Sequence, residues 1–438
     1  MTQLQQSVEV VQMATKLSSD RRTFVKWAVA LPLFGQIAAQ DMFGKARSGV
    51  KSLTRNQVTT YKDLGVRTLI NARGTWTYLS ASLELPEVKQ AQLEAARHYV
   101  DVIELQHAVG KRLAELSGAE SGMVTSGAAG AMASATAGCI AGTDPQKIWQ
   151  LPDTTGMKDQ VIMLGGRSAF DSAIRLAGGK LVVVHTPEEL QSAINDKTAM
   201  LYTTSLGDPL KKALEITKRA GVPLLLDDAA GIPPISNLKL YSQMGCDLYC
   251  FSGGKGLLGP QCSGLLLGRK DLIEAALANT NPWEGAVCRP MKVGKEEIMG
   301  CLAAVEAWTK LDPDVLYKQW DARVKRIAKL VDTVPGVKTN IYVPKDGNRY
   351  PTLRVMWDEQ AWKFSVQDCA KKLSDGEPRI EVLTASNPSG VLARLNKDFM
   401  RPGAENHLEI ISMSLKDGED LIVGKRLREV LRAASKSA

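Results

Sequence analysis

The stretch VPLLLDDAAGIPPISNLKLYSQMGCDLYCFSGGKG (222–256) decides the fold. It opens with an apolar run that ends at Asp227, passes through a segment with helical spacing (237–245), and closes with a second apolar run (246–252). Short apolar runs separated by one helix are typical of parallel strands joined by crossover helices. In such sheets the ligand lies beyond the carboxyl ends of the strands. The stretch therefore predicts an α/β fold with functional residues just after Asp227 and Ser252.

The same alternation extends back to residue 160, and the pattern changes beyond a helix at 295–311. The additional apolar runs and helices before that point are 160–164, 168–178, 180–185, 187–194, 198–204 and 208–221. Beyond it, a long helix (313–333) and two further helices (365–374, 417–435) accompany short strands at 338–343, 351–357, 378–383 and 407–413. We therefore predict a large domain over 67–310 with a mainly parallel sheet, and a smaller α+β domain over 311–438.

Composition excludes several classes of protein. Of the 438 residues, 44% are hydrophobic and 23% are charged, which excludes wholesale disorder. No uncharged apolar run approaches the roughly 20 residues that a membrane-spanning helix needs. The seven cysteines lack the paired spacing of a zinc site or a disulfide framework, and the four histidines are far apart. We expect buried thiols and no metal.

The net charge of +8 is concentrated in the amino-terminal tail. Residues 1–65 carry nine Lys/Arg and four Asp/Glu, so only about +3 belongs to the remaining chain, where the signs are interleaved. A nucleic-acid-binding surface needs clustered positive charge. We therefore expect no nucleic-acid partner.

The tail has the layout of an export signal. DRRTFVK (20–26) is followed by fourteen uncharged residues, WAVALPLFGQIAAQ (27–40), which is too short to span a membrane permanently. The Arg21–Arg22 pair resembles the twin-arginine type of signal. We predict a signal-like segment over 1–40, a linker over 41–66 and a periplasmic or exported protein. The alternative is an amphipathic arm that packs on a partner subunit of a cytoplasmic protein.

A lysine stands in a glycine-rich loop directly after the last strand of the deciding stretch. FSGGKGLLGPQCSGLLLG (251–268) places Lys255 between Gly254 and Gly256, so the backbone can bend and the amine can reach a cofactor. A Walker phosphate loop is excluded, because Tyr249 stands where its first glycine belongs and Gly256 replaces its Ser/Thr. Burial at a strand end favours the neutral amine and suits Schiff-base formation. Taken alone, a structural lysine is the alternative.

A carboxylate ends the preceding strand. Asp227, in PLLLDDAAGIPP (223–234), can pair with a protonated pyridine nitrogen and keep the ring an electron sink. Ala229 is small enough for a flat ring to stack over it. The alternative is that Asp227 caps the following turn. We expect Asp228 to point the other way, towards solvent or behind the site.

A third segment suits phosphate binding. In TSGAAGAMASATAGC (125–139), Ser126, Gly127, Ala128 and Ala129 lead into a helix of small residues. Free backbone N–H groups at such a helix start bind phosphate without a basic side chain, although a plain close-packed helix is the alternative. A phosphate cradle, a ring-nitrogen partner and an imine-forming lysine in that chain order together predict pyridoxal 5′-phosphate.

The segment 67–310 resembles a branch of the pyridoxal-phosphate enzymes of the aspartate-aminotransferase type, fold type I. That branch contains selenocysteine synthase, the L-seryl-tRNA(Sec) selenium transferase, and D-glucosaminate-6-phosphate ammonia-lyase. The motifs that carry the resemblance are LINARGTWTYLSAS (69–82), ELSGAESGMVTSGAAGAM (115–132), LDDAAGIPPISNL (226–238), FSGGKGLLGPQCSGLLLGRKDLI (251–273) and RPMKVGKEEIMG (289–300). The chain is more similar to the ammonia-lyase side, because a signal-like tail stands where selenocysteine synthase has a tRNA-binding domain.

The resemblance implies a large domain with a mainly parallel, seven-stranded type of sheet, and a homodimer or higher homo-oligomer. It implies that Lys255 carries the cofactor, that Asp227 holds the ring nitrogen, and that Ser126 to Ala129 with Ser252 bind the phosphate. Two departures stand out. Close relatives often carry His-Arg where this chain has Gly166-Arg167, and Asp228 with Gly231 departs from the usual Asp-Ala-Ala-Ala-Glu run.

An anionic substrate needs positively charged side chains to bind it. The candidates are Arg73, Arg167, Arg289 and Arg354, each in or beside a family-like segment. For each alone a surface salt bridge is the alternative.

The leading hypothesis is a lyase that eliminates a β-substituent or ammonia from a small anionic amino acid or amino-sugar acid, with Lys255 as the base for the α-proton. The first alternative is a selenium or sulfur transferase of the selenocysteine synthase type. The second is an exported cofactor-binding protein without full activity.

Overall fold

The computed structural model describes residues 59–345, 347–384 and 406–437. The signal-like segment over 1–40 and most of the linker over 41–66 lie outside the described residues. Contacts divide the chain into two compact units, Met1–Thr68 and Leu69–Ala438. All strands and helices named below belong to the second unit.

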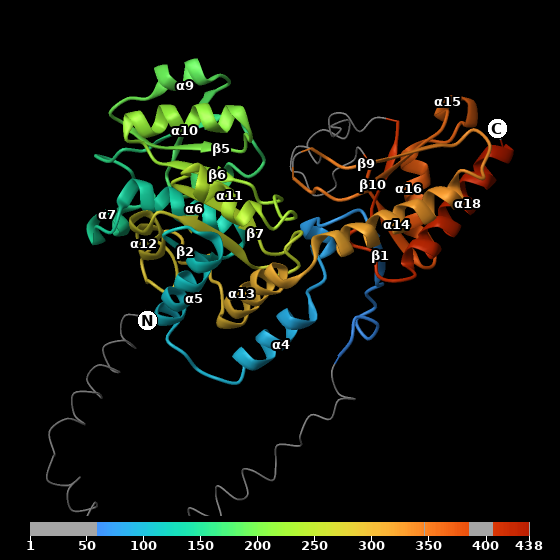
Figure 1. Cartoon of the computed structure of the whole chain (residues 1–438), viewed down its shortest axis with the longest axis horizontal. Helices are drawn as coiled ribbons and strands as arrows, with labels where there is room; N and C mark the ends of the chain where they lie inside the picture. Colours follow the sequence, from blue (N-terminus) through green and yellow to red (C-terminus); the bar gives the residue numbers. More distant parts are fainter. Residues whose placement is uncertain (1–58, 346, 385–405, 438) are drawn as a thin grey trace, which may run out of the picture. The chain divides into compact units, whose positions relative to one another are not determined.

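A seven-stranded sheet forms the larger part of this unit (Figure 1). Its strands, in spatial order, are β2 (Ser121–Thr125), β8 (Gly264–Gly268), β7 (Leu248–Ser252), β6 (Leu224–Asp227), β5 (Thr198–Thr203), β3 (Gln160–Leu164) and β4 (Lys180–Val184). β8 runs antiparallel to both of its neighbours, and the other pairs are parallel. The expected mainly parallel, seven-stranded sheet is therefore confirmed.

Helices cover both faces of this sheet, so its strands read as nearly continuous apolar runs. One core lies under α5 (Val102–Ser117), α9 (Pro187–Ala193), α10 (Asp208–Ala220), α11 (Asn237–Met244) and α13 (Lys295–Lys310). The other lies under α6 (Gly127–Ala141), α8 (Ser172–Leu176) and α12 (Lys270–Ala278). Successive strand residues alternate between these cores: Leu224 and Leu226 enter the first, and Leu225 enters the second.

The helix ends follow local sequence signals. Asp101 caps α5 by accepting from the N–H groups of Ile103 and Glu104, and Gly118 ends that helix in the left-handed region. Two short helices, α4 (Pro86–Ala95) and α7 (Pro145–Gln150), begin at a proline whose missing N–H costs nothing there. A 3-10 turn, η2 (Thr77–Leu79), precedes α4.

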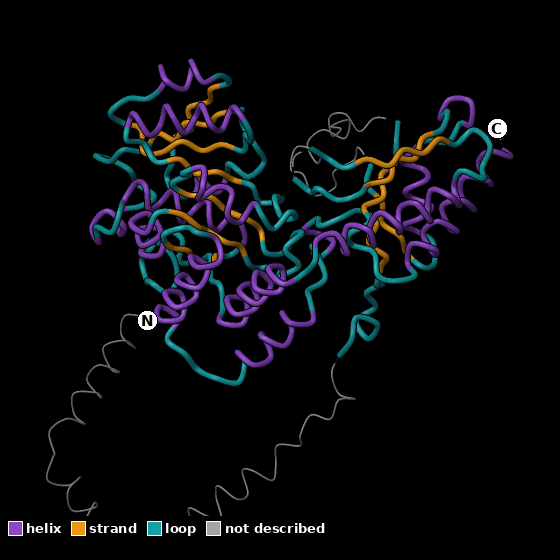
Figure 2. Tube along the Cα trace, in the orientation of Figure 1, coloured by secondary structure: helices purple, strands orange, loops and turns teal. Residues whose placement is uncertain are grey.

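The carboxyl-terminal part forms a smaller α+β arrangement (Figure 2). β12 (Leu408–Ile411), β10 (Thr352–Met356) and β9 (Lys338–Tyr342) make an antiparallel sheet. β1 (Leu69–Ala72) pairs in parallel with β11 (Arg379–Val382). The accompanying helices are α14 (Pro313–Val331), α15 (Glu359–Trp362), α16 (Val366–Asp375) and α18 (Glu419–Ser437). Residues from β1, α14, α16 and α18 share one apolar core.

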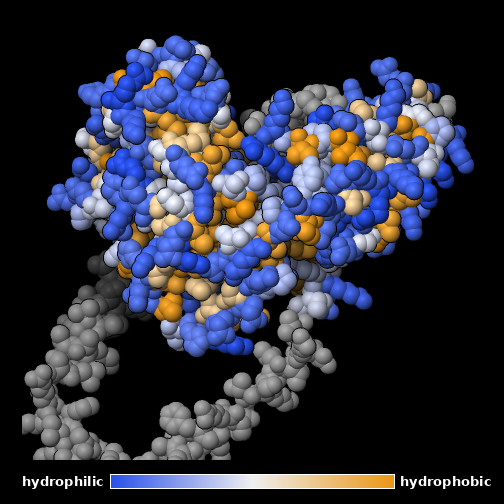
Figure 3. All heavy atoms as spheres, in the orientation of Figure 1, coloured by the Kyte–Doolittle hydropathy of each residue, from blue (hydrophilic) through white to orange (hydrophobic). Residues whose placement is uncertain are grey.

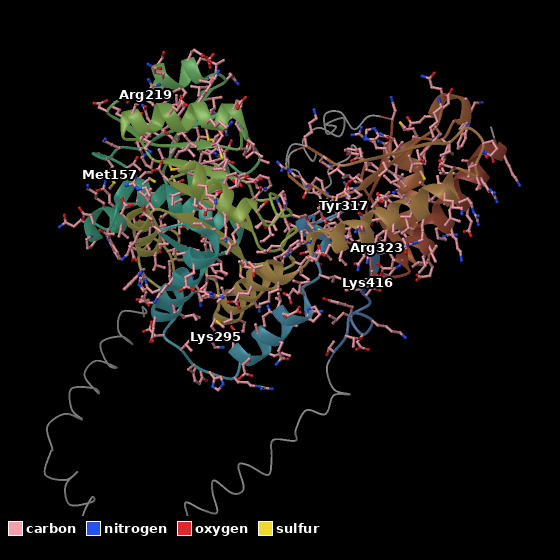
Figure 4. All side chains as sticks on the ribbon, in the orientation of Figure 1. Met157, Arg219, Lys295, Tyr317, Arg323 and Lys416 are labelled. Atoms are coloured by element: carbon pink, nitrogen blue, oxygen red, sulfur yellow. The ribbon has the colours of Figure 1, made fainter. Side chains whose placement is uncertain are left out.

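The long helices α14 and α18 are also joined by ion pairs. Arg323, which is labelled in Figure 4, lies 2.8 Å from the carboxylate of Asp417 in the turn before α18. Arg326 of α14 pairs with the buried Asp420 of α18. In the view of Figure 3 the surface is mainly hydrophilic, with hydrophobic side chains in separate patches. Among the described helices, none is both long and apolar enough to cross a membrane.

The predicted elements from residue 160 onwards are confirmed to within a few residues at their ends. The helix predicted at 168–178 is shorter, because it is reduced to α8 after a turn. β1 was counted with the large domain, yet it pairs with β11 in the carboxyl-terminal part. The borders at 310 and 311 stay a prediction.

Candidate active site

The carboxyl ends of β6 and β7 bring the candidate residues together. The Asp228 N–H donates to the Cys250 carbonyl at 3.2 Å, and the Ser252 N–H donates to the Ala229 carbonyl at 3.1 Å. Because side chains alternate along a strand, Asp227 lies on the same face as Leu225, which is the face covered by α6. The predicted residues Asp227, Ala229 and Ser252 therefore meet at one edge of the sheet.

The Asp227 carboxylate is fixed by three donors. Tyr202, on the neighbouring strand β5, donates its hydroxyl to Asp227 Oδ2 at 2.8 Å. Asp227 Oδ1 accepts from the Ala229 N–H at 3.1 Å and from the Cys250 thiol at 3.7 Å. Tyr202 is 2% exposed, so this carboxylate is oriented by a buried partner. The bond to Ala229 also makes Asp227 a turn cap, as the alternative from the sequence has it, and its pairing with a ring nitrogen stays a prediction.

Lys255 lies in the loop after β7, in an environment that favours the neutral amine. Burial lowers the pKa of Lys255, while the negative charge of Asp227 opposes that shift. Lys255 Nζ lies 6.0 Å from the centre of the Phe170 ring. A lysine with a lowered pKa beside a carboxylate is typical of a functional site rather than of a surface salt bridge.

The glycines around Lys255 are required by close packing. A Cβ on Gly253 would lie 1.9 Å from Ser263 Oγ, and one on Gly256 would lie 2.0 Å from the Ile232 carbonyl oxygen. Neither glycine has a positive φ. The loop is thus fixed by its contacts, which positions the Lys255 amine.

The start of α6 lies beside the end of β7. Gly264 is the register partner of both Thr125 and Ser252, so β2 and β7 end at the level where the antiparallel β8 begins. Ser126, which precedes α6, makes no capping bond with its side chain, and Gly127 has φ +71° with open space where a Cβ would be. The first N–H groups of α6 and the Ser252 hydroxyl therefore lie where a phosphate can be held.

Gly264→Ala should weaken phosphate binding. The added methyl group would lie 2.4 Å from the Gly127 carbonyl carbon and 2.7 Å from the Ala128 nitrogen, so the first turn of α6 must shift. We expect the affinity for pyridoxal phosphate to fall roughly tenfold or more, a loss of about 1.4 kcal/mol or more, measured by equilibrium dialysis.

Gly110→Ala is the matched control for that variant. Its methyl group would lie 2.2 Å from the Gly122 carbonyl oxygen, where α5 packs on β2. Gly110→Ala should lower the melting temperature without changing cofactor affinity. Equal affinities of the Gly264→Ala variant and the wild type would contradict the phosphate site at α6.

Asp228 points away from Asp227, as expected, and of the two expected positions it takes the one behind the site and not the one in solvent. It is 7% exposed and accepts a hydrogen bond from the Tyr241 hydroxyl on α11, at the opposite face from Asp227. Burial raises the pKa of Asp228. A Cβ on Gly231 would lie 1.7 Å from Asp228 Oδ2, so the Asp228 carboxylate fills the space that a side chain at 231 would need. Asp228 and Gly231, the two residues that depart from the Asp-Ala-Ala-Ala-Glu run, therefore depend on each other: the Asp228 carboxylate fits only because residue 231 has no side chain.

Three of the four candidate arginines have partners. Arg73 donates to the Val382 carbonyl at 2.8 Å, Arg167 pairs with Asp171, and Arg354 donates to Glu409 at 3.0 Å. Arg289 is half-buried. Within the described ranges, no hydrogen bond or ion pair joins these four arginines to Asp227 or Lys255. Their role in substrate binding stays a prediction.

Sequence reasoning missed three residues near the site. Tyr202 could have been found from strand alternation, because it lies one position from the end of β5 on the face of Asp227. Phe170 lies after β3, close to the position where relatives carry a histidine. Arg349 lies in the loop between β9 and β10, and no motif marked it.

These residues fit pyridoxal phosphate. Lys255 offers a buried amine, Asp227 offers an oriented carboxylate for the ring nitrogen, and the uncapped start of α6 offers N–H donors for the phosphate. Bound there, the cofactor supplies an aldehyde carbon and an electron-withdrawing ring. Fold and site together define the class of pyridoxal-phosphate-dependent enzymes of fold type I.

Comparisons with known proteins agree with this class. Residues 179–292 match the aminotransferase class-V family. The chain is 31% identical to a 5′-C-glycyluridine monooxygenase-decarboxylase from Streptomyces sp over 86% of this chain and 93% of that protein. It is 28% identical to a D-glucosaminate-6-phosphate ammonia lyase from Salmonella typhimurium (strain 14028s / SGSC 2262) over 86% of this chain and 98% of that protein. A solved structure of D-glucosaminate-6-phosphate ammonia-lyase, 27% identical, covers 86% of this chain and is itself covered to 99%, with a TM-score of 0.70.

The chain belongs to the aminotransferase class-V family of pyridoxal-phosphate-dependent enzymes, fold type I. The family that the motifs indicated, the cofactor and the enzymatic nature of the protein are thereby confirmed.

Proposed function

We propose that the protein is a lyase that eliminates ammonia or a β-substituent from a small anionic amino acid or amino-sugar acid. The observation that carries the proposal is the buried Lys255 amine, whose pKa is lowered by burial and which stands beside the oriented Asp227 carboxylate. The ammonia lyase among the relatives, named for an amino-sugar acid phosphate, supports an anionic substrate.

Lys255, Asp227 and Tyr202 have different roles in this reaction. The Lys255 amine accepts the proton from the substrate's α-carbon, and burial, which lowers its pKa, favours the form with a free lone pair. With the cofactor bound, the Asp227 carboxylate would pair with the protonated ring nitrogen, and Tyr202 holds that carboxylate in place. The loop of Lys255, packed against Ser263 and Ile232, limits the movement of the base.

The test is to incubate the purified holoprotein with a panel of amino acids and amino-sugar acids. We expect ammonia and a 2-oxo acid to be released in equal amounts from at least one anionic amine. Release of carbon dioxide without ammonia would favour a decarboxylase, the reaction type in the name of the Streptomyces relative. Absence of any visible cofactor absorbance would contradict the proposal.

We also propose a homodimer or higher homo-oligomer. Large apolar side chains such as Leu93, Tyr99 and Trp149 are more than 60% exposed, which favours a surface that a second copy covers. Light scattering should give a mass at least twice 47.5 kDa. A monomer at micromolar concentration would contradict this.

We further propose that the protein is exported through the Arg21–Arg22 segment. Replacing both arginines with lysines keeps the charge, so an arm that packs on a partner should tolerate the change, whereas a signal read by a receptor should fail. Cell fractionation should then find the wild type outside the cytoplasm and the double variant inside it. Wild-type protein confined to the cytoplasm with an intact amino terminus would favour the arm.

A further inference from the structure

A single distant residue holds the carbonyl group of Gly254, which belongs to the peptide bond that joins Gly254 to Lys255. Ser82 donates to this oxygen twice, from its backbone N–H at 3.0 Å and from its hydroxyl at 2.9 Å. Ser82 is 9% exposed and lies 172 positions before Gly254 in the chain. Because the peptide bond is planar, both hydrogen bonds also orient the backbone nitrogen of Lys255.

Neighbouring carbonyls of this loop have other donors. The Lys255 carbonyl accepts from the Leu258 N–H at 3.0 Å, inside the loop itself. The Leu257 carbonyl accepts from the indole N–H of Trp308 on α13 at 2.8 Å. The peptide units before and after Lys255 are therefore both held, and Ser82 holds the one before it.

The segment between β1 and α4, which carries Ser82, lies along this loop. The Leu85 N–H donates to the Leu258 carbonyl at 3.1 Å, and the Gln261 side-chain amide donates to the Thr77 carbonyl at 3.0 Å. Ala81 and Leu258 both have φ +58°, a left-handed backbone that residues with a side chain rarely adopt. Such a conformation persists only where the surroundings determine it, so this contact fixes the backbone on both of its sides.

The packing around Gly254 leaves its peptide unit little freedom. A Cβ on Gly254 would lie 2.8 Å from Gln261 Cα and 3.4 Å from Ala81 Cβ. The Lys255 amine stands at the end of a long, flexible side chain, so a small rotation of this peptide unit displaces the amine much further. Reaction rates fall steeply when a reacting group is misplaced. The bonds from Ser82 therefore bear on the reactivity of Lys255.

We propose that Ser82 is a positioning residue for Lys255. Its hydroxyl holds the Gly254 carbonyl and thereby directs the Lys255 amine for attachment of the cofactor, in which the amine and the aldehyde join with loss of one water. Ser82 acts through the backbone and not on the reacting atoms. This inference rests on the proposed function, because it concerns the residue to which that function gives the proton transfer.

The experiment compares two forms of the cofactor on the full-length protein after the bound cofactor has been removed. Pyridoxal 5′-phosphate can become attached to Lys255, whereas pyridoxine 5′-phosphate carries an alcohol and cannot. Ser82→Ala should slow attachment of pyridoxal phosphate roughly tenfold, or about 1.4 kcal/mol in the barrier, measured by borohydride trapping against time and peptide mapping. Its affinity for pyridoxine phosphate, measured by equilibrium dialysis, should equal that of the wild type, because the phosphate and ring sites are untouched.

Two further variants separate positioning from stability. Ser82→Thr keeps the hydroxyl and should restore an attachment rate close to that of the wild type. Ser412→Ala is the matched control, because Ser412 is fully buried and its hydroxyl donates to the Pro351 carbonyl at 2.7 Å in the carboxyl-terminal part. It should lower the melting temperature and keep the wild-type attachment rate.

An attachment rate in Ser82→Ala equal to that of the wild type would overturn the inference, as would an equal slowing in Ser412→Ala. A weaker affinity of Ser82→Ala for pyridoxine phosphate would also overturn it, because Ser82 would then shape the whole cofactor site. If the alanine variant does not fold, Ser82→Cys, whose thiol is a weak donor, takes its place with the same expected slowing. If attachment depends on Ser82 while no amine releases ammonia, the proposed function fails and the inference stands.

Discussion

Replacement of Lys255 by alanine is expected to abolish covalent attachment of the cofactor and to lower kcat/KM by about 10³-fold, within the range on the order of 10²–10⁴ that a positioned acid-base group contributes. The amine at this position is buried, its pKa is lowered, and its loop is fixed by contacts of Gly253 and Gly256. The measurement is borohydride reduction followed by peptide mapping, together with turnover.

Two variants make this result specific. Lys270→Ala removes an exposed lysine at the start of α12 and should leave attachment and turnover unchanged. Added methylamine should restore part of the activity of Lys255→Ala, because a free amine can take the α-proton when the side chain is gone. A Lys255→Ala protein that still yields a cofactor-modified lysine peptide would show that another residue carries the cofactor.

The alternation of apolar strands with helices along the sequence made the sheet and the position of the candidate site predictable. The runs around Asp227 and Lys255 are apolar on both faces, which only a covered parallel sheet explains, and function follows the strand ends. Local signals such as a glycine-flanked lysine and a small-residue helix start then mark the cofactor site. Within each of these motifs the residues are near one another in sequence, so each pattern can be recognised without the tertiary structure.

The remaining features depend on contacts between distant segments. The loop of Arg349 reaches the turn after β6 across more than a hundred residues, through the bond from Asn348 to Ala230. The partner of Asp228 is likewise set by the packing of α11, which brings Tyr241 to it. No periodicity records such tertiary contacts, so the sequence predicted the cofactor more fully than the contacts between distant segments.

Asp227→Asn should retain the cofactor and lose activity by roughly 10²-fold, the scale of a removed electrostatic partner at a reaction centre. The amide keeps the size of the side chain but cannot hold a protonated ring nitrogen by charge. Tyr202→Phe tests how much the orientation of the Asp227 carboxylate contributes, because it removes the 2.8 Å hydrogen bond to Oδ2 while the carboxylate remains. We expect about a tenfold loss for Tyr202→Phe, or about 1.4 kcal/mol in the barrier.

The matched control is Asp159→Asn, the same substitution at another carboxylate of the same sheet. Asp159 is 5% exposed and bonds Thr154 and Lys180 before β3, at the opposite end of the strands. Its loss should lower the melting temperature and leave kcat and the visible spectrum unchanged. Asp227→Asn should change kcat and the pH dependence of the visible spectrum with little change in melting temperature. If both variants lost only stability, Asp227 would be a structural cap of the turn, and the electron-sink role would have to be assigned to another residue.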